Sequence, residues 1–237
     1  MTRLPRALLV CLVLAAAGCD QPPEIESLAG VAQGTTYTLQ WWSLESVDEQ
    51  ALAAAAAAEL DRIDGLLSNY RPDSTLERFN ATRSVEPQTL PAELVTLLRL
   101  AVEVHRASER CFDPTVRPLV HLWGFDGDEP RVPAAADIAA ALADVGLDKL
   151  EIVDDHTVRK LRPSVEIDMA SIGQGYTVAR LAQVLEGFGI RSYVVEIGGE
   201  LLARGRKPGG QPWRIGIENP TAAGGVAEPL VMPGDPA

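Results

Sequence analysis

Two strand-forming runs joined by only two glycines restrict the fold more than any other feature of this sequence. Ser192–Ile197 and Glu200–Arg204 flank Gly198-Gly199, and a two-residue glycine connection is typical of a β-hairpin. Other strand candidates also follow one another directly, at 149–153, 157–161 and 165–169, with a turn predicted at Asp154-Asp155. These adjacent runs favour an α+β fold, with a mixed, mainly antiparallel sheet and packed helices, over a doubly wound sheet.

Helices are predicted between the strand runs. An alanine-rich segment ending near Leu67 carries a stripe of leucine and isoleucine, and Ser46 with Glu49 predicts a capping box at its start. Turn-forming residues at 69–74 end this helix. Further helices are predicted at 91–108, with Pro91 at the first position, from about 133 to 146, and at 172–188. Strands at 35–42, 213–217 and 227–232 complete the predicted elements.

The first 18 residues have the pattern of a targeting signal. Arg3 and Arg6 precede an apolar run at 7–18, which is shorter than the ~20 residues of a membrane span. Cys19 follows Ala-Ala-Gly as in the lipobox of bacterial lipoproteins, so we expect it to carry lipid; an ordinary signal peptide is the alternative. Asp20 resembles an inner-membrane retention signal. We therefore expect a chain anchored by lipid to the periplasmic side of the bacterial inner membrane, with a tether at 19–29 and one domain at 30–237.

Charge and cysteine content argue against a nucleic-acid-binding protein and against a protein stabilised by disulfides. The chain has 21 Lys and Arg against 33 Asp and Glu, a net charge of −12, whereas a nucleic-acid surface needs a basic stripe. We therefore expect no nucleic-acid partner. Cys11 leaves with the signal and Cys19 carries lipid, so Cys111 is alone and cannot form an internal disulfide. The hydrophobic core must then supply the stability.

Several familiar site patterns are missing from the sequence. There is no phosphate-binding loop, and Gly173-Gln174-Gly175 lacks the third glycine of a dinucleotide fingerprint because Val178 stands there. The three histidines are not at metal-ligand spacing. We expect His105 on a helix surface and His156 in a turn.

The candidate site lies where the predicted strand at 165–169 meets the next helix. Asp168 comes directly before a helix start, whose free N–H groups and positive dipole end suit a phosphate. A carboxylate there can bind a sugar hydroxyl or help to hold a divalent cation. The alternative is that Asp168 or Ser171 only caps the helix. Gly198-Gly199 has a similar alternative as a plain hairpin turn.

A set of short motifs, in matching order along the chain, resembles the ApbE family. The motifs are Gly34-Thr35-Thr36-Tyr37, residues 67–74 leading to Arg78-Phe79-Asn80, and residues 112–120, 122–125, 168–176, 196–200 and 212–217. This family comprises FAD:protein FMN transferases, many of them periplasmic lipoproteins. The resemblance covers residues 30–217, and the independently identified lipobox agrees with it.

The resemblance implies a Mg²⁺-dependent phosphoryl transfer with FAD as substrate. A Thr or Ser hydroxyl of an acceptor protein attacks the FAD pyrophosphate on the flavin side, AMP leaves, and FMN stays attached through a phosphoester. The acceptors that the family suggests are subunits of respiratory membrane complexes.

The resemblance also implies which residues form the site. Ser171 is expected to coordinate the metal through its backbone carbonyl. Gln33 and Gln174 depart from a family pattern that often has Met and Lys there, and glutamine keeps a hydrogen bond but loses the charge opposite phosphate. The expected FAD contacts are Gln33, Tyr70, Cys111, Phe112, Asp113, Asp168 and Gln174.

The family pattern continues with Ser-Gly-x-Tyr-Arg, His-x-x-Asp-Pro-x-Thr-Gly and an Asp/Thr pair, which this sequence does not contain before Ala237. The resemblance thus implies a domain that is incomplete at its C-terminus and has weak or no transferase activity, and no catalytic residue is assigned. Two other classes stay open: an FAD-binding periplasmic lipoprotein without catalysis, and a generic solute-binding or scaffold lipoprotein.

Overall fold

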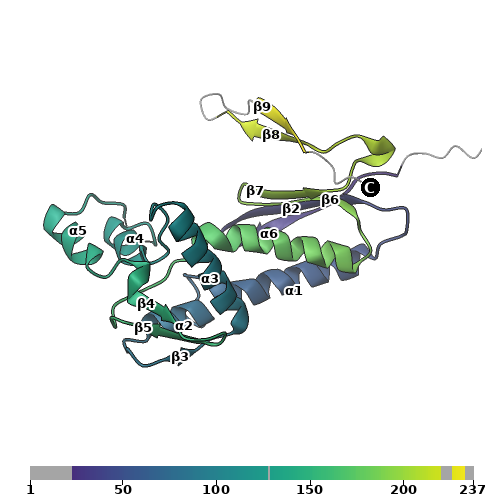
Figure 1. The fold of residues 1–237 in the computed structure, drawn as a ribbon. Coiled ribbons are helices and arrows are strands. Elements are labelled where there is room, and N and C mark those ends of the chain that lie inside the picture. The colour runs from purple at the N-terminus through teal and green to yellow at the C-terminus, as the bar shows by residue number, and fades with distance from the viewer. Residues whose placement is uncertain (1–22, 128, 220–225, 233–237) are drawn as a thin grey trace, which may run out of the picture.

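The computed structural model describes residues 23–127, 129–219 and 226–232. The predicted signal at 1–18 and Cys19 lie outside the described residues. The two longest helices, α1 (Glu49–Leu67) and α6 (Ala170–Gly187), lie side by side against one face of the main sheet (Figure 1). In the described part of the chain, no helix has both the length and the apolar character of a membrane span.

The main sheet has four antiparallel strands in the order β1-β2-β6-β7. They are β1 (Glu26–Ala32), β2 (Thr35–Trp42), β6 (Ser192–Ile197) and β7 (Glu200–Arg204). The predicted β6–β7 hairpin is confirmed, and Gly198 and Gly199 adopt φ angles of 59° and 100°, which glycine reaches without steric strain. The sequence pattern does not predict β1, which contains residues 26–29 of the expected tether. This strand has few β-branched residues and owes its order to pairing with β2.

One face of the main sheet packs on α1 and α6 to form a first hydrophobic core. Alternate residues of β2 point toward the helices because successive side chains of a strand lie on opposite faces. Tyr37, Leu39 and Trp41 are buried there. The helices contribute Leu52, Ala56 and Leu60 from α1, and Val178, Leu181, Ala182 and Leu185 from α6.

A second hydrophobic core surrounds the C-terminal end of α1. It packs Ile63, Leu66 and Leu67 of α1 against α2 (Thr75–Ala81) and α3 (Ala92–Ala107). A three-stranded sheet in the order β3-β5-β4 borders this core. Its strands are β3 (Gln88–Thr89), β5 (Thr157–Lys160) and β4 (Leu150–Ile152). The predicted apolar stripe of α1 is therefore confirmed and serves both cores.

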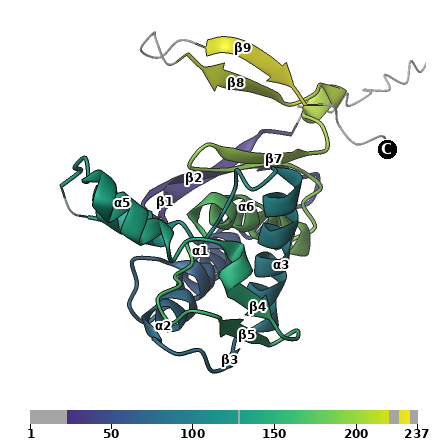
Figure 2. The same cartoon turned by 60° about the vertical axis from the view of Figure 1, so that its left-hand side comes forward.

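The remaining elements lie at the two ends of the molecule. The helices α4 (Arg117–Trp123) and α5 (Ala135–Leu142) contact each other, and 3-10 turns occur at Leu147–Lys149 and Pro208–Gly210. The strands β8 (Arg214–Glu218) and β9 (Val226–Val231) form a separate hairpin beyond β7, away from the helices (Figure 2). Trp213 ties this region to β7, since its Nε1 donates to the Arg204 carbonyl at 3.1 Å.

Two predictions about local structure are wrong. The capping box at Ser46 does not form. Instead, Asp48 is the N-cap of α1, and its Oδ1 accepts from the Ala51 amide at 3.0 Å. His105 is buried rather than on the helix surface, because its Nδ1 lies 2.6 Å from the Phe112 carbonyl oxygen at the end of α3.

The segment 165–169 forms no strand and joins none of the described sheets, so the strand prediction there is also wrong. Every second residue of the segment is apolar and buried, namely Val165, Ile167 and Met169. This spacing explains why the sequence resembles a strand. A side chain replaces the strand partner. Asn80 Oδ1 accepts from the Ile167 amide at 2.8 Å, and Asn80 Nδ2 donates to the Ile167 carbonyl at 2.9 Å.

Candidate functional site

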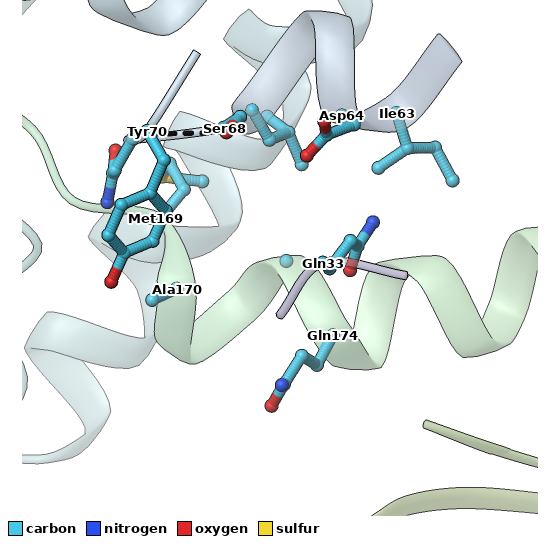
Figure 3. A pocket seen from close by; sticks show the side chains of 11 residues that line it. Gln33, Ile63, Asp64, Ser68, Tyr70, Met169, Ala170 and Gln174 are labelled. Carbon is cyan, nitrogen blue, oxygen red and sulfur yellow. Dashed lines mark hydrogen bonds between the residues drawn. The ribbon is translucent and has the colours of Figure 1, made fainter. Parts of the chain in front are cut away.

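An open cavity of about 150 Å³ lies between the C-terminal end of α1, the β1–β2 turn and the start of α6 (Figure 3). This volume is smaller than the roughly 300–1,000 Å³ of typical small-molecule sites. Both apolar and polar side chains line it, as in sites for ligands that have an apolar face and polar edges. The lining residues are Gln33, Ile63, Asp64, Leu67, Ser68, Asn69, Tyr70, Met169, Ala170, Gly173 and Gln174.

Tyr70 lies in the turn that follows α1. Ser68 shapes this turn, because its Oγ accepts from the amides of Tyr70 at 3.2 Å and Arg71 at 3.1 Å. Ser74 Oγ closes it by donating to the Ser68 carbonyl at 2.7 Å. The Tyr70 side chain is left 77% exposed at the cavity, and such a ring is available for stacking on an aromatic ligand.

Gln33 enters the cavity from the β1–β2 turn, where its φ of 52° is in the left-handed region. Its Nε2 donates to Thr177 Oγ1 at 3.0 Å. The same hydroxyl donates to the Gly173 carbonyl at 2.8 Å, and Thr177 is fully buried. The turn is therefore fastened to α6 beside the cavity.

Gln174 reaches the cavity from the first half of α6, and a glycine of the β6–β7 hairpin makes room for it. A Cβ atom on Gly198 would lie 2.5 Å from Gln174 Nε2. Position 198 therefore favours glycine for its positive φ, and a Cβ atom there would oblige the end of the Gln174 side chain to move. The hairpin is thus part of the site's support as well as a plain turn.

Asp168 comes directly before Met169 at the start of α6, but it is not among the residues that line the cavity. Its amide donates to the Pro114 carbonyl at 2.7 Å, and its Oδ1 accepts from the Ala170 amide at 2.8 Å. The N-cap of α6 is Met169, which makes no side-chain cap hydrogen bond. The capping interpretation is therefore wrong for Ser171, which lies inside the first turn, and holds only in part for Asp168.

The predicted contacts at 111–113 do not line this cavity. The Asp113 carboxylate holds a neighbouring turn: Oδ1 accepts from Thr115 Oγ1 at 2.5 Å, and Oδ2 accepts from the Leu147 amide at 3.2 Å. Cys111 is exposed, and the Phe112 carbonyl contacts His105. The next residue, Pro114, connects this stretch to the backbone before α6 through its carbonyl, which accepts from the Asp168 amide. Gln33, Tyr70 and Gln174 are brought together, and the others stay predictions.

The sequence motifs do not single out Asp64 and Asn69, although both line the cavity. Asn69 lies within the motif at 67–74, which gives it no stated role, and Asp64 stands three residues before that motif. Asn69 Oδ1 is buried and has no hydrogen-bond partner within residues 23–127, 129–219 and 226–232. A buried polar atom without a partner is rare in folded proteins, and here it could accept a hydrogen bond from a ligand.

Behind the cavity, an ion-pair cluster joins α1, α3 and α6. Arg62 pairs with Glu93 at 2.7 Å and with Glu59 at 2.9 Å, and Arg180 pairs with Glu59 at 2.6 Å. The Arg62 guanidinium holds the pKa of both carboxyls below their usual range, and burial raises the pKa of Tyr176, which also hydrogen-bonds Glu93. These carboxylates are therefore ionised at neutral pH and support the helices rather than exchange protons.

The described residues do not assemble a metal centre from side chains. Among them, no group of three or more His, Cys, Asp or Glu residues could hold a metal ion. Magnesium prefers several oxygen ligands in an octahedral arrangement, and Ser171 with Asp168 falls short of that set. We therefore derive no chemical step through a metal.

Comparisons with known proteins agree with the geometry. A family model described as the ApbE family matches residues 33–234. The FAD:protein FMN transferases of Vibrio cholerae and Salmonella typhimurium are 35% and 34% identical to this chain, and each alignment covers 94% of this chain and 67% of the relative.

Solved structures give the same result. The flavin transferase ApbE from Vibrio cholerae superposes with a TM-score of 0.80 at 35% identity, covering 84% of this chain and 65% of that chain. The apo flavinyl transferase ApbE of Pseudomonas stutzeri gives 0.77 at 38% identity, covering 83% and 66%. The chain thus spans about two thirds of the length of these relatives. These likenesses confirm the predicted α+β fold.

Proposed function

Because the chain belongs to the ApbE family, we propose that it binds FAD and transfers the FMN moiety to a Thr or Ser hydroxyl of an acceptor protein. One observation carries the proposal. Gln33, Tyr70 and Gln174, which the motifs mark as FAD contacts from distant parts of the chain, line the same cavity. The names of the similar proteins support the choice of FAD over other flat ligands.

The lining residues have the chemistry to hold the flavin end of FAD. Tyr70 offers an exposed ring for stacking on the isoalloxazine, and Met169 offers an apolar contact. Asn69 Oδ1 and the amide of Gln33 can hydrogen-bond the polar edge of the ring. The carboxylate of Asp64 repels phosphate, so we place the pyrophosphate on the other side, toward the positive start of α6.

The transfer itself is a displacement at phosphorus. The acceptor hydroxyl oxygen forms a bond to the flavin-side phosphorus, the bridging P–O bond of the pyrophosphate breaks, and AMP leaves while the hydroxyl proton goes to a base. In such reactions the protein contributes mainly positioning and neutralisation of charge. This chain's described residues supply positioning of the flavin side, and we assign no base among them.

Further features are proposed from the resemblance alone. They are a dependence on Mg²⁺ with the Ser171 carbonyl as one ligand, FAD contacts at Cys111, Phe112, Asp113 and Asp168, and subunits of respiratory membrane complexes as acceptors. Lipidation at Cys19 and attachment to the periplasmic side of the inner membrane complete the set. The second candidate function is FAD binding without transfer.

Both candidates can be tested in one experiment. The full chain is mixed with FAD, Mg²⁺ and an acceptor protein carrying a flavinylation motif. Fluorescent acceptor on a denaturing gel, together with released AMP, supports transfer. Saturable FAD binding without AMP supports the second candidate. If Asp168→Ala and Tyr70→Ala both leave FAD affinity unchanged, a generic solute-binding lipoprotein becomes the better description.

A further inference from the structure

Arg117 is almost completely buried at the start of α4, with 5% of its surface exposed. Arginine is rarely buried to this extent without several partners. Its Nη2 donates to the Asn69 carbonyl at 3.0 Å and lies 2.9 Å from Glu77 Oε1, and its Nε lies 3.5 Å from Glu166 Oε2. The turn after α1, helix α2 and the segment before α6 therefore meet at one guanidinium.

A second polar route joins the same segments. Glu77 Oε1, which faces Arg117, also accepts from Asn80 Nδ2 at 3.2 Å. Asn80 in turn binds both the amide and the carbonyl of Ile167. Hydrogen bonds and ion pairs thus run without a break from the Asn69 carbonyl, through Arg117, to the backbone that leads into α6.

These contacts hold two walls of the cavity. Asn69 and Tyr70 form the wall that follows α1, and Met169 with Ala170 forms the wall at the start of α6. Arg117 binds the first wall directly and the second through Glu166, three residues before Met169. The spacing between the walls therefore depends on the length and planar shape of the guanidinium, which lysine does not reproduce.

The arginine is not well explained as a source of stability. Its Nε is buried and makes no hydrogen bond within the described part of the chain. Burying an ion with an unmade bond costs desolvation energy, and buried ion pairs often contribute little net stability. What the Arg117 guanidinium contributes to the site is a planar group that donates hydrogen bonds in fixed directions.

We propose that Arg117 is a positioning residue that sets the distance between the Tyr70 turn and the start of α6, so that a flavin fits between them. This inference rests on the proposed function, because it requires that the cavity binds FAD. It predicts that Arg117 influences FAD binding through Tyr70 and not independently of it.

A double-mutant cycle on the full chain tests the proposal, with Kd for FAD measured from flavin fluorescence. The single variants Arg117→Lys and Tyr70→Ala should each raise Kd about tenfold, and the double variant should match Tyr70→Ala alone, because contacting residues that act together are not additive. Arg117→Lys keeps a charge opposite Glu77. Arg99→Lys is the matched control, since Arg99 pairs with Asp155 away from the cavity at 2.7 Å, and it should bind FAD as the unchanged chain does.

The outcomes distinguish a failure of the positioning role of Arg117 from a failure of the proposed FAD-binding function. Multiplicative effects of the two substitutions, or unchanged binding in Arg117→Lys, would overturn the positioning role while leaving the proposed function in place. Failure of the unchanged chain to bind FAD would overturn both. Circular dichroism checks folding. If Arg117→Lys does not fold, Glu77→Gln interrupts the same route from α2, and its effect on Kd should be equally coupled to Tyr70→Ala; independence there would also overturn the proposal.

Discussion

At the scale of single residues, Gly198 connects the fold of the main sheet with the site. We expect Gly198→Ala to destabilise the protein by about 1–2 kcal/mol, because an alanine at a positive φ is strained. It should also weaken FAD binding several-fold, because the new Cβ would displace Gln174. Denaturant unfolding and a fluorescence titration with FAD measure the two effects.

Gly199 provides the matched control for this substitution. It has a positive φ of 100°, but a Cβ there would meet no atom within 4 Å. Gly199→Ala should therefore lose stability and keep the FAD affinity of the unchanged chain. Equal losses of affinity in both variants would show that the hairpin conformation matters rather than the room for Gln174.

Lys160 is a second residue whose surroundings give a clear prediction. Its side chain is fully buried, and its Nζ donates to the carbonyls of Asn80 at 3.1 Å and Thr82 at 2.9 Å. Burial, assisted by the nearby positive charge of Arg83, lowers the pKa of Lys160 from 10.5 to about 8. The unfolded chain therefore holds this proton more tightly than the folded protein does.

The sign of the pH dependence follows from this difference. Between about pH 8 and 10.5 the unfolded state binds more protons at this site, so stability rises with pH. The free energy of unfolding of the unchanged chain should increase relative to Lys160→Met across that range, by at most about 3 kcal/mol. Urea unfolding at several pH values measures it. A difference that stays constant or shrinks with rising pH would contradict the prediction.

At the scale of elements, the start of α1 distinguishes two capping residues. Asp48→Ala should cost about 1 kcal/mol, because it removes the acceptor of the Ala51 amide at the helix N-terminus. Ser46→Ala should change stability little, since Ser46 is exposed and lies outside the helix. Thermal unfolding of the two variants provides the comparison. A larger loss of stability in Ser46→Ala would contradict the assignment of Asp48 as the N-cap.

The elements that follow from local pattern are those whose partners are close in the sequence. The β6–β7 hairpin and the stripe of α1 belong to this group, because turn glycines and helical spacing act over a few residues. The segment 165–169 has the alternating apolar pattern of a strand, yet its hydrogen-bond partner is the side chain of Asn80. A hydrophobic pattern along the sequence does not reveal such a partner. The same holds for β1, which is ordered by β2, and for His105, which is buried by the loop carrying Phe112.

At the scale of the whole molecule, the site forms where the two hydrophobic cores meet. Helices α1 and α6, which lie side by side in Figure 1, contribute to both cores. The cavity lies between the end of α1 and the start of α6 (Figure 3). Motif resemblance marks Tyr70 and Gln174 as FAD contacts, but it gives no role to Asn69 or Arg117, although both lie within matching motifs. Their roles depend on segments that only the folded chain brings together.

Metal dependence is a property of the complete reaction and can be tested by removing the ion. We expect EDTA to abolish FMN transfer wherever transfer is observed, because charge on the pyrophosphate must be neutralised. Adding Mg²⁺ in excess should restore it, which serves as the control. Transfer that continues at full rate in EDTA would contradict the proposed magnesium dependence.

The central claim is that the cavity between α1 and α6 holds the flavin of FAD. Calorimetric titration of the full chain with FAD tests it most directly, with Tyr70→Ala in parallel and with Mg²⁺ present or absent. The account predicts saturable binding with one FAD per chain, weakened about tenfold in Tyr70→Ala by the loss of ring stacking. No heat of binding under either condition, or equal affinity in both proteins, would contradict it.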